Sequence, residues 1–249
     1  MYVPRSVNDC GTRRGGHSAW GNVGGENGWV TLQELAERAV GLVGRDAERA
    51  ERAVVGITGA PGSGKSTLGE HLAAAVAALG VAVVRVPMDG FHLADDELVR
   101  LRRRDRKGAI DTFDVDGYAS VLRRARTTLA RTVYAPDFDR TLEQPVAGSI
   151  PVLPEARLVI TEGNYMLSPD PAWRRVRELC DEVWFCQIDG EERLRRLVAR
   201  HERFGKAPDE ARAWVRRVDE SNAAQIQAWR GSADLVVDLL GLELAAGRD

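Results

Sequence analysis

The chain has 249 residues, 44% of them hydrophobic and 29% charged, which is the composition of an ordinary globular protein and excludes a fibrous or disordered one. Its 35 lysines and arginines nearly cancel its 37 aspartates and glutamates, so no global positive field favours nucleic acid as a partner. No apolar run approaches the roughly 20 residues of a membrane-spanning helix and the first residues lack the apolar segment of a secretory signal, so we expect a cytoplasmic protein without a membrane partner.

The N-terminal region is polar and is followed by a helix signal. Residues 1–28 are rich in Gly, Asn, Arg and Ser and show no apolar periodicity, so they cannot bury enough surface to offset their ordering entropy. We predict a flexible tail there. Thr31 and Glu34 have the spacing of a capping box, and apolar residues then recur at helical spacing, which predicts an amphipathic helix over residues 31–44.

The rest of the chain alternates short Val- and Ile-rich runs with helical stretches. This pattern indicates a mostly parallel sheet covered on both faces, and hence one doubly wound α/β domain over residues 29–249. The cysteines lack the spacing of a disulfide framework or a zinc site. The expected strands are residues 54–58, 81–86, 158–161, 183–188 and 235–237. The expected helices are residues 66–79, 94–104, 117–129, 171–179, 191–203 and 209–229.

The segment GAPGSGKST directly follows the first of these strands and opens a helix, and it matches the phosphate-loop pattern G-x-x-x-x-G-K-S/T. Its glycines allow backbone N–H groups to converge on phosphate oxygens, and the helix N-terminus adds a partial positive charge. Lys65 would reach the β- and γ-phosphates and the Ser66 hydroxyl would bind Mg²⁺; a glycine-rich turn without a ligand is the alternative. The residues expected to bind ATP are Gly59, Ala60, Pro61, Gly62, Ser63, Gly64, Lys65, Ser66 and Thr67.

Two acidic residues follow later strands. Asp89, in MDGFHL, and Glu162, in VITEGNY, are expected at the carboxyl edge of the sheet, where ligands of doubly wound folds bind. We expect Asp89 to accept a proton from an attacking hydroxyl and Glu162 to bind Mg²⁺ or its water, although the two roles could be exchanged. A turn or cap residue is the alternative for Asp89.

The motifs GAPGSGKS, MDGFH and TEGNY, in this order, resemble the P-loop kinases that include uridine kinase, pantothenate kinase and phosphoribulokinase. The resemblance extends over residues 54–237. The stretches DGFH and RKGAIDTFDVDGY are similar to the pantothenate kinase side, and more so to relatives described as nucleoside or fructose kinases. The resemblance implies a nucleotide-kinase-like P-loop fold with a helical lid, and Mg²⁺-dependent transfer of the γ-phosphoryl group of ATP to a hydroxyl of a small metabolite. These kinases are often homodimers.

The resemblance also implies an acceptor site. Asp89 matches the acid that acts on the acceptor hydroxyl, and VYAPDFDR matches a segment that lines the acceptor pocket, through Tyr134, Asp137, Phe138 and Arg140. Independently, this mixture of aromatic and charged residues suits a polyhydroxylated ligand, and a structural hairpin is the alternative. The segment lacks the histidine usual in pyrimidine-nucleoside kinases, which weakens the interpretation as a uridine kinase.

Three further residues are candidates for the acceptor site. Lys107 lies in a polar stretch, residues 104–116, that could cover the acceptor or carry the lysine to a phosphate; an ion-paired surface loop is the alternative. His92 could bind the acceptor or a phosphate, or be packed structurally. Asn222 resembles an asparagine that lies near the acceptor or the adenine in pantothenate kinase.

Arginines recur three and four residues apart near residue 200, which places them on one helix face, where their mutual repulsion would be relieved by a polyphosphate. The resemblance places a lid over ATP at residues 190–210. We expect Arg196 and Arg200 to stabilise the transferring group, with Lys206 at the mobile end of the lid. A solvated face with Glu192 paired to Arg196 is the alternative. The arginines are Arg193, Arg196, Arg200 and Arg203.

The acceptor itself is not determined by these patterns. We order the candidates as a nucleoside or nucleoside-like compound, a sugar such as fructose, and pantothenate or a similar alcohol, because pocket shape decides such choices. A nucleotide-binding regulator or ATPase without a small acceptor is an alternative of another class, disfavoured by the acid expected at Asp89 and by the lack of distinct switch elements.

Overall fold

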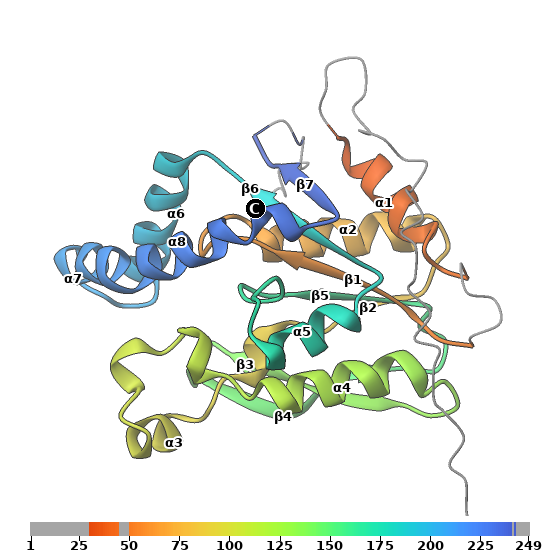
Figure 1. Cartoon of the computed structure of the whole chain (residues 1–249), viewed down its shortest axis with the longest axis horizontal. Coiled ribbons are helices and arrows are strands. Elements are labelled where there is room, and N and C mark those ends of the chain that lie inside the picture. Colours follow the sequence, from red (N-terminus) through yellow and green to blue (C-terminus); the bar gives the residue numbers. More distant parts are fainter. Residues whose placement is uncertain (1–29, 45–49, 241, 243–249) are drawn as a thin grey trace, which may run out of the picture.

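The computed structural model describes residues 30–44, 50–240 and 242. The predicted tail over residues 1–28 lies outside this part of the chain. The described residues contain a five-stranded parallel sheet with strand order β2-β5-β1-β6-β7 (Figure 1), which confirms the predicted doubly wound α/β class. Its strands are β1 (Ala53–Thr58), β2 (Val83–Arg85), β5 (Leu158–Glu162), β6 (Glu182–Gln187) and β7 (Leu235–Asp238).

Helices connect the strands and cover the sheet. Most match the predicted ranges within a few residues, and both hydrogen bonds of the capping box between Thr31 and Glu34 are present. The α-helices are α1 (Leu32–Val40), α2 (Lys65–Ala78), α3 (Asp95–Arg100), α4 (Val115–Thr127), α5 (Pro171–Glu178), α6 (Gly190–Arg203), α7 (Pro208–Trp214) and α8 (Glu220–Ala228). Shorter turns are η1 (Met88–Phe91), η2 (Arg104–Arg106), η3 (Ile110–Thr112), the π-helical η4 (Val215–Asp219) and η5 (Arg230–Ser232).

The sheet separates two hydrophobic cores. Every residue of β1 is buried, and its side chains alternate between the cores: Val55 and Ile57 pack on the side of α1 and α2, whereas Val54 packs on the side of α4 and α5. Figure 1 shows these helix pairs on opposite sides of the sheet. A strand buried on both faces needs apolar residues at successive positions, which is the pattern that the sequence contains.

A two-stranded antiparallel hairpin, formed by β3 (Val133–Asp139) and β4 (Gln144–Val152), lies apart from the parallel sheet. The sequence suggested this hairpin only as an alternative. It lies against η1, where a Cβ atom on Gly90 would be 2.4 Å from the carbonyl oxygen of Pro136. Because only glycine allows such an approach, Gly90 lets the hairpin cover the segment that carries Asp89.

Two predicted helices differ from the structure. The helix expected over residues 94–104 ends at Arg100, and Arg102 has a φ of 56°. The helix expected over residues 209–229 is divided into α7 and α8 by the π-helical η4. π-turns occur preferentially at functional sites, and this one carries Asp219, which accepts a hydrogen bond from His201 of α6 at 2.9 Å.

The side chain of Arg52 ties the sheet to the segments before and after the hairpin. It is 1% exposed and donates hydrogen bonds to backbone carbonyls on both segments, among them those of Ala125, Thr128 and Ala156, each at 2.7 Å. We expect Arg52→Met to lower the free energy of unfolding by about 3 kcal/mol, because several buried acceptors lose their donor. Urea denaturation measures this loss, and Arg131→Met, at an exposed position, should change stability by less than about 0.5 kcal/mol. Equal stability of the two variants would contradict this role.

Candidate active site

A cleft of about 860 Å³ opens at the carboxyl ends of the central strands. It is bordered by the loop between β1 and α2, by η1, by the segment around Lys107, by the hairpin and by helices α6 to α8. This is where a doubly wound fold binds its ligands. We call the side formed by the β1–α2 loop, Glu162 and α6 the phosphate side, and the side formed by residues 89–108 and the hairpin the acceptor side.

The β1–α2 loop adopts a conformation that requires glycine. Gly59, Gly62 and Gly64 have φ angles of 149°, 78° and 88°. A Cβ atom on Gly59 would lie 2.6 Å from the carbonyl oxygen of Cys186, and one on Gly62 would lie 2.6 Å from Cγ of Leu197. The loop ends at the N-terminus of α2, whose free N–H groups and partial positive charge suit a phosphate. The geometry therefore fits a polyphosphate.

We expect Gly59→Ala to weaken nucleotide binding by at least about tenfold, because the new methyl group forces the loop away from Cys186 and no L-residue readily adopts this φ. Isothermal titration with a non-hydrolysable ATP analogue and Mg²⁺ measures the affinity. Gly231→Ala, where a Cβ atom meets nothing within 4 Å, is the matched control. An affinity of Gly59→Ala equal to that of this control would contradict the loop's role.

Lys65 and Ser66 begin α2 and face Glu162, the last residue of β5. The ammonium of Lys65 is buried and donates to the carbonyl of Ala60 at 3.0 Å, and the Ser66 hydroxyl donates to Oε1 of Glu162 at 2.9 Å. Burial lowers the pKa of Lys65, and the negative charge of Glu162 opposes this shift. Burial and the charge of Asp89 raise the pKa of Glu162. A bound phosphate would stabilise the charged form of Lys65, and a bound cation would stabilise the charged form of Glu162.

The donor set around Glu162 fits Mg²⁺. Among the described residues no group of three potential metal-binding side chains is preassembled. Mg²⁺ commonly uses one or two protein oxygens and completes its shell with substrate phosphates and water. The Ser66 hydroxyl and the Glu162 carboxylate, 2.9 Å apart, would supply those protein oxygens.

Asp89 lies in η1, beyond the end of β2, and lines the cleft. The side chain is 35% exposed and accepts a hydrogen bond from the guanidinium of Arg140 on the hairpin at 3.3 Å. Asp89 lines the same cleft as Lys65 and Ser66. The arrangement can present a hydroxyl to Asp89 beside the phosphate loop.

His92 and Lys107 line the acceptor side. The Nδ1 atom of His92 lies 2.8 Å from the carbonyl oxygen of Asp89, and its ring packs between Phe113 and Phe138, with centroids at 4.1 and 5.0 Å. Burial lowers the pKa of His92, which favours the neutral imidazole. The ammonium of Lys107 lies 5.3 Å from the centre of the Phe138 ring.

The structure separates the candidates of the VYAPDFDR segment. Phe138 and Arg140 line the cleft. Tyr134 is 59% exposed and Asp137 is exposed with its carboxylate accepting the N–H of Phe138, and neither lines the cleft. Successive side chains of a strand point to opposite faces, and the register of β3 shifts between Ala135 and Asp137. The expectation that all four residues contact the acceptor is therefore corrected for two of them.

The lid arginines are also separated. Arg200 lines the cleft, as does Lys206, whose ammonium lies 5.0 Å from the centre of the Trp214 ring. Arg196 lies outside the cleft and is paired with Glu192 at 2.7 Å, one turn earlier on α6. The alternative of a solvated ion pair thus describes Arg196, although its guanidinium lies 3.7 Å from the position of a Cβ atom on Gly64.

Asn222 on α8 is 7% exposed and lines the cleft; its role near the acceptor or the adenine stays a prediction. Several lining residues were not anticipated, among them Asp95, Asn164 and the pair of His201 and Asp219. Of these residues, Asn164 belongs to the TEGNY motif and the others belong to none. The position of Asn164, two residues after Glu162, was the one available signal.

The comparisons with known proteins agree with this site. The chain is 35% identical over 221 residues, 86% of its length and 92% of the relative, to a Schizosaccharomyces pombe protein named "Putative uridine kinase C227.14". It belongs to the uridine kinase-like P-loop kinases. A solved structure from Silicibacter sp. TM1040, titled as a "putative fructose transport system kinase", is 37% identical, covers 83% of this chain and 98% of that one, and has a TM-score of 0.75. The protein is therefore a nucleotide-binding phosphotransferase.

Two other matches cover less of this P-loop kinase. The "ATP-dependent kinase-like protein notR'" of Aspergillus versicolor is 36% identical over 133 residues, 51% of this chain and 77% of the relative. A family profile described as methylmalonyl Co-A mutase-associated GTPase MeaB matches residues 29–92. That segment contains the phosphate loop, which GTPases and kinases share, and ends before the hairpin and the lid. Within the described residues, no helix is long and apolar enough to cross a membrane.

Proposed function

We propose that this P-loop kinase uses ATP and Mg²⁺ to phosphorylate a hydroxyl of a small metabolite. A nucleoside or nucleoside-like compound is the first candidate, followed by a fructose-type sugar and a pantothenate-type alcohol. The observation that carries the proposal is that Asp89 shares one cleft with Lys65 and Ser66. The names of the relatives, among them a uridine kinase, a fructose transport kinase and an ATP-dependent kinase, support the same chemistry.

Each residue has a defined task in the proposed transfer. Asp89 accepts the proton of the acceptor hydroxyl, whose oxygen bonds to the γ-phosphorus, while the bond from that phosphorus to the β–γ bridging oxygen breaks and ADP leaves. Lys65 and Arg200 stabilise the negative charge on the transferring group. A magnesium ion held by Ser66 and Glu162 would neutralise phosphate charge. Helices α6 and α7 exclude water from this side of the cleft.

A coupled assay of ADP release tests the proposal. Purified protein with ATP and Mg²⁺ is mixed with a panel of nucleosides, sugars, polyols and pantothenate, and phosphate esters are identified by mass spectrometry. We expect ADP release that depends on the acceptor and equals the phosphate ester formed. ADP release at the same rate with and without every alcohol would contradict the proposal and favour an ATPase or regulator.

A further inference from the structure

The cations of the cleft fall into two groups that differ in their partners. On the acceptor side every one of them is paired with a carboxylate: Lys107 with Asp95 at 2.7 Å, Arg104 with Asp95 at 3.1 Å, and Arg140 with Asp89 at 3.3 Å. Lys107 and Arg104 share the single charge of Asp95, and two further acidic residues, Asp105 and Glu143, also line this side of the cleft. The acidic residues of this wall therefore balance its cations. A ligand that brings its own negative charge would compete with those carboxylates.

The phosphate side is different. Arg200 on α6 and Lys206, three residues beyond the end of this helix, line the cleft, and within the described residues neither forms an ion pair with a carboxylate. Burial and the charge of Arg140 lower the pKa of Arg200, and the more distant carboxylates of Asp89, Asp219 and Glu162 oppose this without forming an ion pair with it. Lys65 is buried in the same cleft, and the charge of Arg200 acts on it. Within the described part of the chain, cations without a direct ion pair therefore gather where the phosphates of a nucleotide would lie, and ion-paired cations gather where the acceptor would lie.

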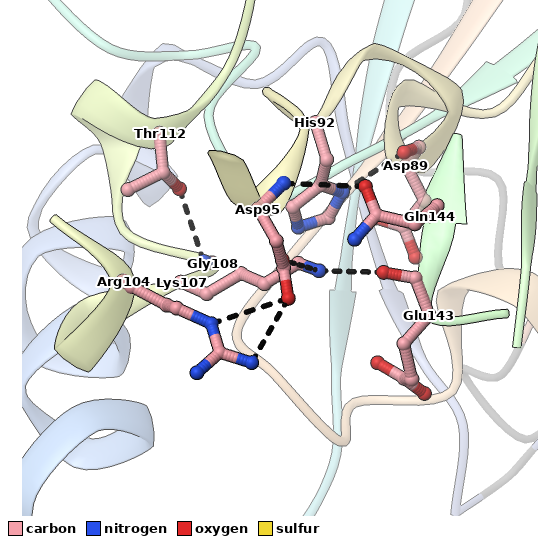
Figure 2. A network of polar contacts seen from close by, with 9 residues as sticks. All are labelled: Asp89, His92, Asp95, Arg104, Lys107, Gly108, Thr112, Glu143 and Gln144. Carbon is pink, nitrogen blue, oxygen red and sulfur yellow. Dashed lines mark hydrogen bonds and ion pairs between the residues drawn. The ribbon is translucent and has the colours of Figure 1, made fainter. Parts of the chain in front are cut away.

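Asp95 is the centre of the compensated wall (Figure 2). Its two carboxylate oxygens accept from Lys107 and from Arg104, and its backbone N–H donates to the side chain of Gln144 at 3.2 Å. Burial alone would raise the pKa of Asp95, but the hydrogen bonds and charges of the two cations outweigh it and lower the pKa. Asp95 is thus a fixed anion that joins α3, the segment around Lys107 and the hairpin.

The ammonium of Lys107 keeps one donor for a ligand. It has three N–H groups, of which one is donated to Asp95 and one to the carbonyl oxygen of Glu143 at 2.6 Å. The ring of Phe138 lies beside it, and Asp89 lines the same cleft. One N–H donor, one carboxylate acceptor and one aromatic face suit the hydroxyls and the C–H face of a neutral polyhydroxylated molecule.

We propose that Asp95 is a specificity-determining positioning residue, which pairs with Lys107 and Arg104, offsets one of their two charges, and makes this kinase select uncharged polyhydroxy acceptors over acceptors that carry a carboxylate or phosphate. This inference rests on the proposed kinase function. It favours the nucleoside and sugar candidates over pantothenate. Specificity then arises partly because protein carboxylates in the cleft disfavour an acceptor that is itself negatively charged.

Matched pairs of neutral and anionic alcohols test it. For pantothenol and pantothenate, glycerol and glycerate, and glucose and glucuronate, kcat/KM is measured at constant ionic strength. We expect the neutral member to be preferred in each pair that reacts. In Asp95→Asn the ratio of anionic to neutral kcat/KM should rise at least about tenfold, since an uncompensated unit charge roughly 10 Å away at an effective dielectric constant near 20 has about that effect.

Two control variants and a second readout isolate the charge of Asp95. Asp96→Asn alters the neighbouring exposed aspartate, which has no ion pair with any described residue, and should leave the ratio unchanged. The double variant Asp95→Asn, Lys107→Gln removes the released charge and should restore a ratio near that of the wild type. Binding of glycerate to each variant saturated with Mg²⁺ and a non-hydrolysable ATP analogue gives a second readout, with a gain expected in folded Asp95→Asn alone.

The outcomes separate the two proposals. Preference of the wild type for the anionic members, or equal ratios and equal glycerate binding in Asp95→Asn and Asp96→Asn, would overturn the role of Asp95 and leave the kinase assignment intact. ADP release independent of every alcohol would overturn the kinase function, and this inference with it.

Discussion

Lys65→Ala is expected to lower kcat/KM by about a thousandfold or more for every acceptor. The variant lacks the buried ammonium that stabilises the negative charge developing on the transferring phosphoryl group. The ammonium is buried and held by the carbonyl of Ala60 at 3.0 Å, so no other side chain occupies its place. The measurement is steady-state kinetics of acceptor-dependent ADP release. Lys65→Arg should not recover activity, since a planar guanidinium does not fit the position of a compact ammonium.

The melting temperature of each Lys65 variant serves as the folding control. A folded Lys65→Ala protein that retained more than about a tenth of wild-type kcat/KM would contradict the role of this lysine, because loss of one such group typically costs at least a hundredfold.

Asp89→Asn should separate binding from transfer. The substitution keeps the shape of the side chain but removes the carboxylate that accepts the hydroxyl proton, so we expect kcat to fall by about 10² to 10⁴ while the affinity for Mg²⁺ and ATP changes by less than about threefold. Asp116→Asn, at an exposed position on α4, is the matched control and should behave as the wild type. Equal losses of nucleotide affinity in the Lys65 and Asp89 variants would contradict the separate roles assigned to them.

Local sequence patterns predicted the parts of the fold in which each residue's environment is fixed by its neighbours along the chain. The strands of the parallel sheet are buried on both faces, so their Val- and Ile-rich runs were visible. The phosphate loop needs glycine at Gly59 and Gly64 for its backbone conformation. Its motif therefore located the phosphate side of the cleft.

The acceptor side depends on contacts between distant segments, and the sequence predicted it less completely. Asp95 and Glu143 are brought to Lys107 by the packing of α3 and the hairpin on the same side of the cleft, and no spacing rule connects them. On α6, helical periodicity placed Arg196 and Arg200 on one face, but the relation of α6 to the sheet decides that Arg200 lines the cleft. The alternation of side chains along β3 likewise could not predict which residues face the cleft, because the register shifts after Ala135.

The central claim is that one cleft holds a triphosphate on the β1–α2 loop with Asp89 beside its terminal phosphate. A crystal structure with a non-hydrolysable ATP analogue and Mg²⁺ tests it most directly. We predict that the backbone amides of residues 59–66 and the ammonium of Lys65 contact the phosphates, with the Asp89 carboxylate facing the γ-phosphorus across the space for a hydroxyl. An analogue bound elsewhere, or Asp89 turned away from the terminal phosphate, would contradict the account.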